Sequence, residues 1–190
     1  MHSHIEDQTF TKATTDQIKG NNLTYDHCQF IGCDLNNAFL DTLIFIDCTF
    51  KDCNLHLAQV NNTGWQNITF KQCKLSGVNF SKSHDFLFEV HFEGCILDNA
   101  IFYKKKNKRG IFTDCSMIET DLTEADLTEA KFNNCNLNRA FFSRTILKGA
   151  DLRSSYNFNI DPDENIIKKA VFSLHGLPGL LGKYDIKING

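Results

Sequence analysis

The chain places a large apolar residue at every fifth position through most of its length. Counting by fives from Tyr25 meets such a side chain at each step as far as Phe80. Two residues before each of these lies a second series that is mostly small, such as Cys28, Cys33 and Ala38. A helix buries a residue about every 3.6 positions and a lone strand every second one, so neither fits a period of five. The pattern predicts short strand segments, each with two inward residues and each followed by a corner.

A longer period of twenty indicates how many segments close one turn. The phase slips by two residues after Phe80 and then resumes. With that slip allowed, steps of twenty trace a phenylalanine column and a cysteine column: Phe30, Phe50, Phe70, Phe92, Phe112 and Phe132, and Cys33, Cys53, Cys73, Cys95, Cys115 and Cys135. Because like residues recur at every fourth segment, four segments make one coil. We therefore predict an all-β parallel solenoid with a square cross-section and about seven coils.

Two interruptions fall on one face of this predicted solenoid. The first is the slip at residues 81–86, after which the resumed series places Leu87 inward. One coil later, the same column would bring Lys105 and Asn107 into the core. A buried lysine is costly without a partner, so we predict that residues 103–110 leave the wall as a loop. Such a protrusion could bind a partner or could be a tolerated surface irregularity.

The repeat divides the chain into three parts. Residues 1–22 repeat poorly and are predicted to cap the N-terminal end, because a solenoid must cover its unpaired strand edges. Residues 23–157 carry the repeat and are predicted to form the solenoid. Residues 158–190 are predicted to form a C-terminal cap and a dimerisation segment.

The C-terminal part contains a helix signal. Residues 161–164 (DPDE) place Asp at an N-cap, Pro at the first helical position and Glu at the third. We therefore expect a short helix across the end of the rod. Phe172, twenty residues after Leu152, should then rejoin a last partial coil.

The tail that follows is more apolar than an end cap requires. A large apolar end with a polar rim usually marks an interface, and the end of a solenoid suits a two-fold contact. We predict a homodimer through this tail, the alternative being a monomer whose tail folds back. The predicted interface residues are Leu174, Leu177, Leu180, Leu181, Ile186 and Ile188.

Charge is unevenly distributed along the chain. The formal net charge is −3, yet five of the twenty Lys and Arg residues lie within residues 104–109. Six acidic residues and no basic residue occur between Phe112 and Ala130, and the strand alternation places them outside. They are Asp114, Glu119, Asp121, Glu124, Asp126 and Glu129.

Sequence patterns that would indicate catalysis or metal binding are not found. The seven histidines are scattered and none lies twenty residues from another, and no phosphate loop or HExxH motif occurs. All eight cysteines fall at inward positions without metal-ligand spacing, and they suggest a reducing compartment. No start typical of a secretory signal and no apolar run of about 18 residues is present. We expect a cytoplasmic protein without a membrane span, enzymatic activity, cofactor or metal.

Two segments match a known repeat consensus. Residues 125–129 (ADLTE) and 150–153 (ADLR) fit the A(D/N)LxX pattern of the pentapeptide-repeat family. The chain resembles this family over about residues 23–157, with the consensus read as a repeat architecture. The resemblance implies a right-handed quadrilateral parallel β-helix, in agreement with the period of twenty.

Residues 75–81 and the C-terminal pattern resemble the quinolone-resistance (Qnr-like) branch of this family. That resemblance implies a dimeric rod that mimics DNA and occupies the DNA-binding surface of DNA gyrase or topoisomerase IV, protecting the enzyme against quinolone-like inhibitors. On this interpretation the six acidic residues form a DNA-mimicking wall, and a loop contacts the enzyme through Lys104, Lys105, Lys106, Asn107, Lys108 and Arg109.

Two features depart from the branch. Residues 23–80 contain no loop insertion, and the predicted loop is short and basic, unlike a DNA mimic. The alternative is a passive scaffold that binds another protein and whose acidity serves solubility. Direct binding of nucleic acid through residues 104–109 is disfavoured by the surrounding acidic residues.

Overall fold

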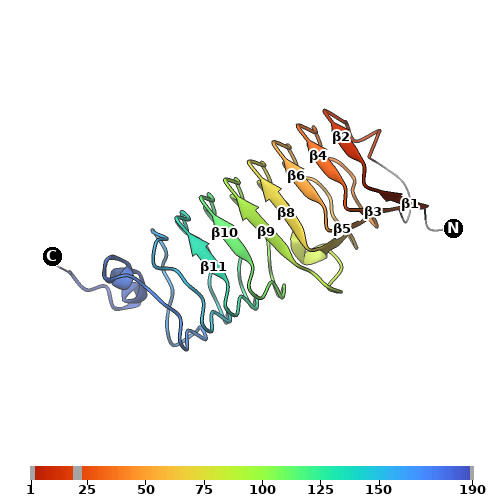
Figure 1. Cartoon of the computed structure of the whole chain (residues 1–190). Coiled ribbons are helices and arrows are strands. Elements are labelled where there is room, and N and C mark those ends of the chain that lie inside the picture. Colours follow the sequence, from red (N-terminus) through yellow and green to blue (C-terminus); the bar gives the residue numbers. More distant parts are fainter. Residues whose placement is uncertain (1–2, 19–22, 189–190) are drawn as a thin grey trace.

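The computed structural model describes residues 3–18 and 23–188, which form a straight rod of stacked coils (Figure 1). Two walls of the rod are regular parallel sheets. One sheet contains β1 (Ser3–Glu6), β3 (Leu23–Asp26), β5 (Ile44–Ile46) and β7 (Gly64–Gln66). The other contains β2 (Thr9–Thr11), β4 (Gln29–Ile31), β6 (Thr49–Lys51), β8 (Ile68–Lys71), β9 (Val90–Glu93), β10 (Ile111–Thr113) and β11 (Lys131–Asn133).

Strand register confirms the period of twenty and the slip within it. Phe30 pairs with Phe50, and Phe112 pairs with Phe132. Between β8 and β9 the offset is 22 instead, since Phe70 pairs with Phe92. The extra two residues are therefore absorbed between these strands without disturbing the phenylalanine column.

Isolated parallel bridges define the other two walls. Asp34 bridges Asn54 in one of them, and Asp121 bridges Phe141 in the other. The predicted all-β, four-sided parallel β-helix is thus confirmed. In the wall of the seven-stranded sheet, the bridges of Lys131 with Asp151 and of Asp151 with Val171 continue the pairing beyond β11.

Stacked aromatic rings fill the core. In the phenylalanine column, the ring centroids of Phe30 and Phe50 lie 4.5 Å apart, and those of Phe112 and Phe132 lie 4.8 Å apart. A second column stacks Phe45 on Trp65 at 4.9 Å. The spacing of coils in a parallel sheet, about 4.8 Å, equals a comfortable ring-stacking distance. This match explains why so many of the inward residues are Phe.

The small inward position accepts a residue that can donate a hydrogen bond. Cys53 Sγ donates to the carbonyl of Phe30, 3.2 Å away, and Thr63 Oγ1 donates to that of Leu40, 2.8 Å away. Both acceptors lie 23 residues earlier, on the preceding coil. All eight cysteines are buried free thiols, and burial raises the pKa of Cys48 to about 12. These thiols are packing residues that hold neighbouring coils together.

The solenoid extends beyond both boundaries expected from the repeat. At the N-terminal end β1 and β2 pair with β3 and β4, and the ring of Phe10 stacks 5.0 Å from that of Phe30. Residues 3–18 therefore build a further coil of the same kind. At the other end the bridge between Asp151 and Val171 adds another, and Phe172 packs against the core as expected.

The prediction of a helix starting at Asp161 is wrong. The carboxylate of Asp161 accepts a hydrogen bond from the amide of Asp163 at 2.9 Å, which makes an Asx turn. The amide of Ile166 then pairs with the carbonyl of Thr145 in the solenoid wall. Backbone groups committed to the wall cannot also form a helix, so this segment is a turn followed by another strand segment.

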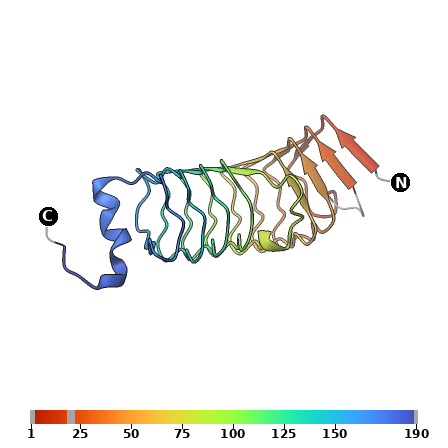
Figure 2. The ribbon, with the colours of Figure 1, turned by 90° about the horizontal axis from the view of Figure 1, so that it is seen from below.

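The helical cap lies further along the chain. The 3-10 helix η2 (Leu174–Leu180) has Ser173 as its N-cap and contains Pro178. A second 3-10 helix, η3 (Gly182–Tyr184), follows directly. Figure 2 shows this segment lying across the end of the rod. Within the described residues, no helix is long and apolar enough to cross a membrane.

Candidate functional site

One short segment leaves the wall, and it lies at the phase slip. Residues 84–87, here called loop 84–87, follow the short 3-10 helix η1 (Phe80–Lys82) and are all exposed. Phe86 is 63% exposed and Leu87 is 62% exposed. The expectation that Leu87 points inward is therefore wrong. Phe88 turns inward instead, with its ring 6.2 Å from that of Phe80.

Residues 103–110, in contrast, do not form the predicted loop. Lys106 bridges Asp126 in the wall, and the backbone on either side follows the regular coil. Lys105 is a core residue with a side chain that is only 2% exposed. Its Nζ donates to the carbonyl oxygen of Ser83 and to Oδ1 of Asp85, both at 2.6 Å. The lysine can be buried because Ser83, directly before loop 84–87, and Asp85 within the loop supply its partners.

Asn107 is buried for a similar reason. Its Nδ2 donates to the carbonyl of Val90 at 2.9 Å, and its Oδ1 accepts from the amide of Val90 at 3.0 Å. The side chain thus satisfies a backbone donor and acceptor where the slip has broken the regular ladder. Lys105 and Asn107, here called the polar clamp, hold the two sides of loop 84–87.

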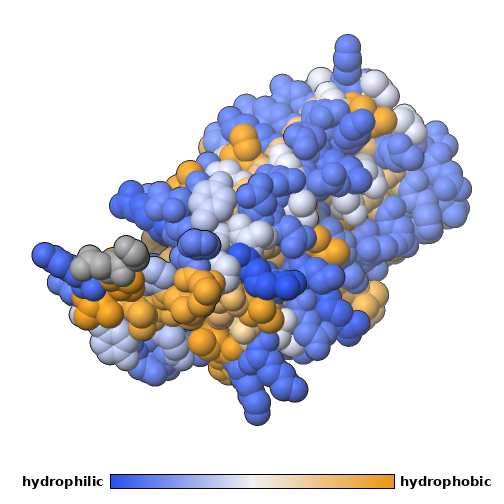
Figure 3. All heavy atoms as spheres, turned by 60° about the vertical axis from the view of Figure 1, so that its left-hand side comes forward, coloured by the Kyte–Doolittle hydropathy of each residue, from blue (hydrophilic) through white to orange (hydrophobic). Residues whose placement is uncertain are grey.

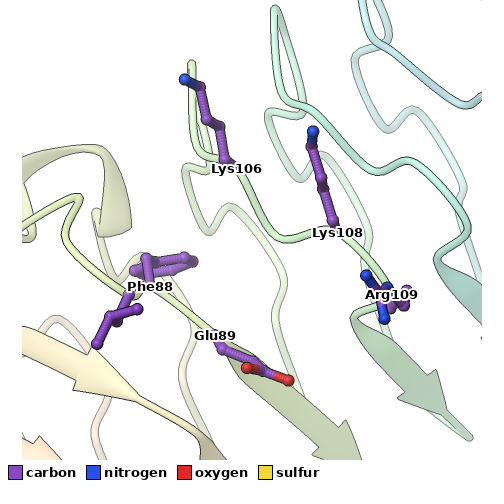
Figure 4. Close-up of a pocket in the computed structure, with 6 residues that line it drawn as sticks. Phe88, Glu89, Lys106, Lys108 and Arg109 are labelled. Atoms are coloured by element: carbon purple, nitrogen blue, oxygen red, sulfur yellow. The ribbon is translucent and has the colours of Figure 1, made fainter.

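A cationic notch opens between loop 84–87 and the next coil. It has a volume of about 430 Å³ and is lined by Leu87, Phe88, Glu89, Lys106, Lys108 and Arg109. Figure 4 shows Lys106 and Lys108 extending in the same direction from one segment, with Phe88 across from them. An apolar side facing a cationic side suits a partner surface that carries an apolar residue beside an acidic group.

The cations of the notch differ in how free they are. Lys108 Nζ lies 3.2 Å from Asp126 Oδ2, and Arg109 Nε lies 3.8 Å from Glu129 Oε2. Among the residues that the structure describes, Lys106 makes no ion pair. Lys106 is therefore the cation most available to a partner. Lys104 lies outside the notch, with its Nζ 3.5 Å from Glu124 Oε2.

The six acidic residues do not form a wall. One coil takes twenty residues, so a run from 114 to 129 passes around most of the rod. Asp114 follows β10, Asp121 bridges Phe141 in a second wall, and Asp126 bridges Ile146 in a third. The acidic residues therefore ring the solenoid, and no single face presents all six.

Most of this ring is also neutralised by neighbouring coils. Glu124 Oε1 accepts a hydrogen bond from Arg144 Nη2 at 2.6 Å, and this bond lowers the pKa of Glu124. Glu119 Oε1 lies 2.9 Å from Arg139 Nη1. Asp126 and Glu129 are paired with Lys108 and Arg109, as described above. In the described part of the chain, only Asp114 and Asp121 of the six make no ion pair. The field of the ring is accordingly weak compared with that of a row of free carboxylates.

The predicted dimer residues lie together at the C-terminal end. Leu174 is 83% exposed, Leu177, Ile186 and Ile188 are exposed, and Leu180 and Leu181 are half-buried. Figure 3 shows an apolar patch at this end of the molecule. The structure thus brings the six residues to one end of the rod, where a second copy could reach them.

Comparison with known proteins defines the family. The sequence model of the pentapeptide repeat region matches residues 23–84 and 86–156. The chain belongs to the pentapeptide-repeat family. The single residue between the two matched stretches, Asp85, lies within loop 84–87. No curated protein matches the sequence.

Solved pentapeptide-repeat structures share the fold. Full-length QnrB1, described as a plasmid-mediated fluoroquinolone resistance protein, matches with a TM-score of 0.64 at 14% identity, over 97% of this chain and 100% of its own. A trypsin-treated variant of QnrB1 matches with a TM-score of 0.64 at 16% identity, over 98% and 100%. At this identity the likeness concerns the fold.

Sequence reasoning placed the protrusion on the correct face but in the wrong coil. It treated Lys105 and Asn107 as residues that the core would reject. It overlooked Ser83 and Asp85 as partners of Lys105, and the backbone of Val90 as the partner of Asn107. One signal was available, since Asp85 lies twenty residues before Lys105 and is therefore its neighbour on the preceding coil.

Proposed function

We propose that this pentapeptide-repeat protein is a non-enzymatic rod that binds a protein partner through loop 84–87 and the cationic notch. The observation that carries the proposal is the exposure of Phe86 and Leu87 on the one segment that leaves the regular wall of the described solenoid. Binding residues commonly sit on loops that a rigid scaffold positions. The polar clamp supplies that rigidity, because Lys105 and Asn107 fix both sides of the loop.

The proposed partner is a type II topoisomerase, DNA gyrase or topoisomerase IV, which the protein would protect against quinolone-like inhibitors in the cytoplasm. Support comes from the resemblance of residues 75–81 and the C-terminal pattern to the quinolone-resistance branch. The likeness of the fold to QnrB1 over nearly the whole chain is consistent with this partner. A passive scaffold for another protein remains the alternative and would use the same notch.

DNA mimicry by the acidic ring is the weaker part of the interpretation that the resemblance to the quinolone-resistance branch implies. The ring surrounds the rod, and four of its members are paired with Lys or Arg on adjacent coils. We therefore assign the principal contact to loop 84–87 and the notch, with Asp114 and Asp121 as the acidic residues that stay available. Among the six residues predicted to contact the enzyme, Lys106, Lys108 and Arg109 keep that role. Lys104 lies outside the notch beside Glu124, and Lys105 and Asn107 act from the core.

The apolar C-terminal patch supports a homodimer. Exposed Leu174, Leu177, Ile186 and Ile188 would be buried if two rods met end to end about a two-fold axis. Such a dimer would present two copies of loop 84–87, one on each rod. A dimeric partner could then be engaged twice, which raises the overall affinity without any new contact.

Binding to purified gyrase tests the proposal. We expect the wild-type protein to bind and the double variant Phe86→Ala/Leu87→Ala to bind at least tenfold more weakly, because apolar anchors dominate such interfaces. Phe39→Ala is the matched control, since Phe39 is 64% exposed on another wall. Circular dichroism confirms that each variant is folded.

The cationic side of the notch is tested by Lys106→Glu, with Lys51→Glu on β6 as control. We expect Lys106→Glu to weaken binding and to reduce its dependence on salt, because a screened attraction is lost. Equal affinities of the wild type and the loop variant for gyrase would overturn the docking site. Absence of binding by the wild type would favour the scaffold alternative.

A further inference from the structure

Side chains from two coils converge on one point at the N-terminal end of the rod. His4 and Glu6 lie on β1, and Asp26 lies at the end of β3 in the next coil. His4 Nε2 is 3.7 Å from Asp26 Oδ2 and 3.9 Å from Glu6 Oε2. The ligand atoms of the three residues all lie within 4.8 Å of one another. No histidine lies twenty residues from another, yet His4 meets carboxylates from two coils.

A second histidine holds the shared aspartate in place. His27 Nδ1 lies 2.6 Å from Asp26 Oδ1, a hydrogen-bonding distance. This contact occupies one carboxylate oxygen and leaves Oδ2 facing His4. Ligating carboxylates in metal sites are commonly fixed by such a second hydrogen bond. The sequence search missed this arrangement because His4 and His27 are 23 residues apart and are diagonal neighbours across coils.

The distances around His4 suit a shared cation better than direct hydrogen bonds. Separations of 3.7 and 3.9 Å exceed the length of an N–H···O hydrogen bond. Around a tetrahedral Zn²⁺ ion, with ligand bonds of about 2.1 Å, neighbouring ligand atoms are about 3.4 Å apart. The two distances from His4 exceed this value by a few tenths of an ångström, and the exposed side chains of His4 and Glu6 can move closer by small rotations.

We propose that His4, Glu6 and Asp26 form a three-ligand site for a transition-metal ion of the Zn²⁺ class, with His27 fixing the orientation of Asp26. The imidazole ligand favours Zn²⁺ and its neighbours over Mg²⁺ and Ca²⁺, which take oxygen ligands. Three protein ligands leave the fourth position for water. The site is independent of loop 84–87 and of any partner that binds there.

The location gives the ion a structural effect. β1 is the outermost strand of its sheet, next to β3. A metal held by His4 and Glu6 on one coil and by Asp26 on the next would fasten this edge to the solenoid. Metal binding to the folded state alone also raises stability by mass action.

Isothermal titration of ZnCl₂ into the metal-stripped full chain tests the site. We expect one saturable ion per chain, with this step lost in His4→Ala and in Asp26→Asn. His27→Ala should retain binding but at least tenfold more weakly, as for other residues that orient a ligand. His91→Ala is the matched control. His91 Nε2 lies 3.3 Å from Glu89 Oε1, but among the described residues His91 belongs to no cluster of three metal-ligating side chains. The His91→Ala variant should therefore bind zinc like the wild type.

Hydrogen exchange supplies a second readout. Saturating Zn²⁺ should slow amide exchange in β1 of the wild type and leave it unchanged in Asp26→Asn. Zinc binding that persists undiminished in both His4→Ala and Asp26→Asn would overturn the site. Unchanged exchange in β1 of zinc-saturated wild type would overturn the fastening of the edge.

Discussion

At the scale of single residues, polar groups inside this solenoid fasten the backbone around them. Asn107 occupies the column that holds Leu127 and Leu147 in later coils, yet it is buried with both amide atoms bonded to Val90. Lys105 is buried in the same coil with its ammonium bonded to Ser83 and Asp85. Both residues compensate for the slip in the preceding coil.

Restoring the repeat consensus at Asn107 should therefore destabilise the protein. Asn107→Leu leaves the buried amide and carbonyl of Val90 without partners, which costs about 2–5 kcal/mol. Urea unfolding followed by circular dichroism measures the loss. Asn138→Leu, at an exposed position, should stay within about 0.5 kcal/mol of the wild type. An Asn107→Leu variant as stable as the wild type would show that the clamp is dispensable.

Sequence reasoning was limited at these same residues. The inward positions could be predicted because the alternation along a strand is local and repeats every five residues. The fate of Lys105 and Asn107 could not, because Lys105 is paired at the insertion and Asn107 is bonded to the backbone of Val90, where the insertion rejoins the wall, and no periodicity describes the path between them. A cost of burial was correctly assigned to Lys105, but the partner that removes it lies one coil away.

At the scale of elements, ring stacking connects one coil to the next. Phe70 on β8 is fully buried, with ring centroids 5.0 Å from Phe50 and 5.3 Å from Phe92. It lies where the register changes from twenty to 22 residues. The column remains continuous across the slip, which keeps the two halves of the rod in one core.

Removing this ring should weaken the whole rod. Phe70→Ala deletes a buried aromatic side chain and is expected to cost about 3–5 kcal/mol in the free energy of unfolding. Phe39→Ala removes the same side chain from the surface and should change stability by about 0.5 kcal/mol or less. Equal unfolding midpoints for the two variants would contradict the role given to the column.

Elements outside the repeat were harder to predict. The motif at residues 161–164 satisfies the rules for a helix start, yet the Asp161 carboxylate closes an Asx turn and the chain returns to the wall. Local capping signals compete with the exposed ladder of the previous coil, and pairing with that ladder prevails. The acidic residues were grouped by position in the sequence, whereas a coil of twenty residues distributes them around the rod.

At the scale of the whole molecule, the rod has two distinct ends and one interrupted wall. The C-terminal end is apolar and carries Leu174, and the N-terminal end carries the cluster around Asp26. Loop 84–87 lies between them, on coils that the polar clamp holds together. Assembly and partner binding are thus assigned to separate surfaces.

The proposed homodimer rests on the C-terminal patch. We expect sedimentation velocity to find a dimer for the wild type and a monomer for Leu174→Glu, because a charge at the centre of an apolar contact is costly. Phe141→Glu is the control, since Phe141 is exposed on a wall away from this end. A wild-type monomer, or a dimer that survives Leu174→Glu and is broken by Phe141→Glu, would contradict this assignment.

The central claim is that loop 84–87 on a rigid rod engages a type II topoisomerase. The most direct test is DNA supercoiling by gyrase in the presence of a fluoroquinolone, with increasing amounts of this protein. We predict that near-equimolar wild type or Phe39→Ala restores supercoiling and that Phe86→Ala/Leu87→Ala does not. No protection by the wild type at micromolar concentration, or equal protection by the loop variant, would contradict the account.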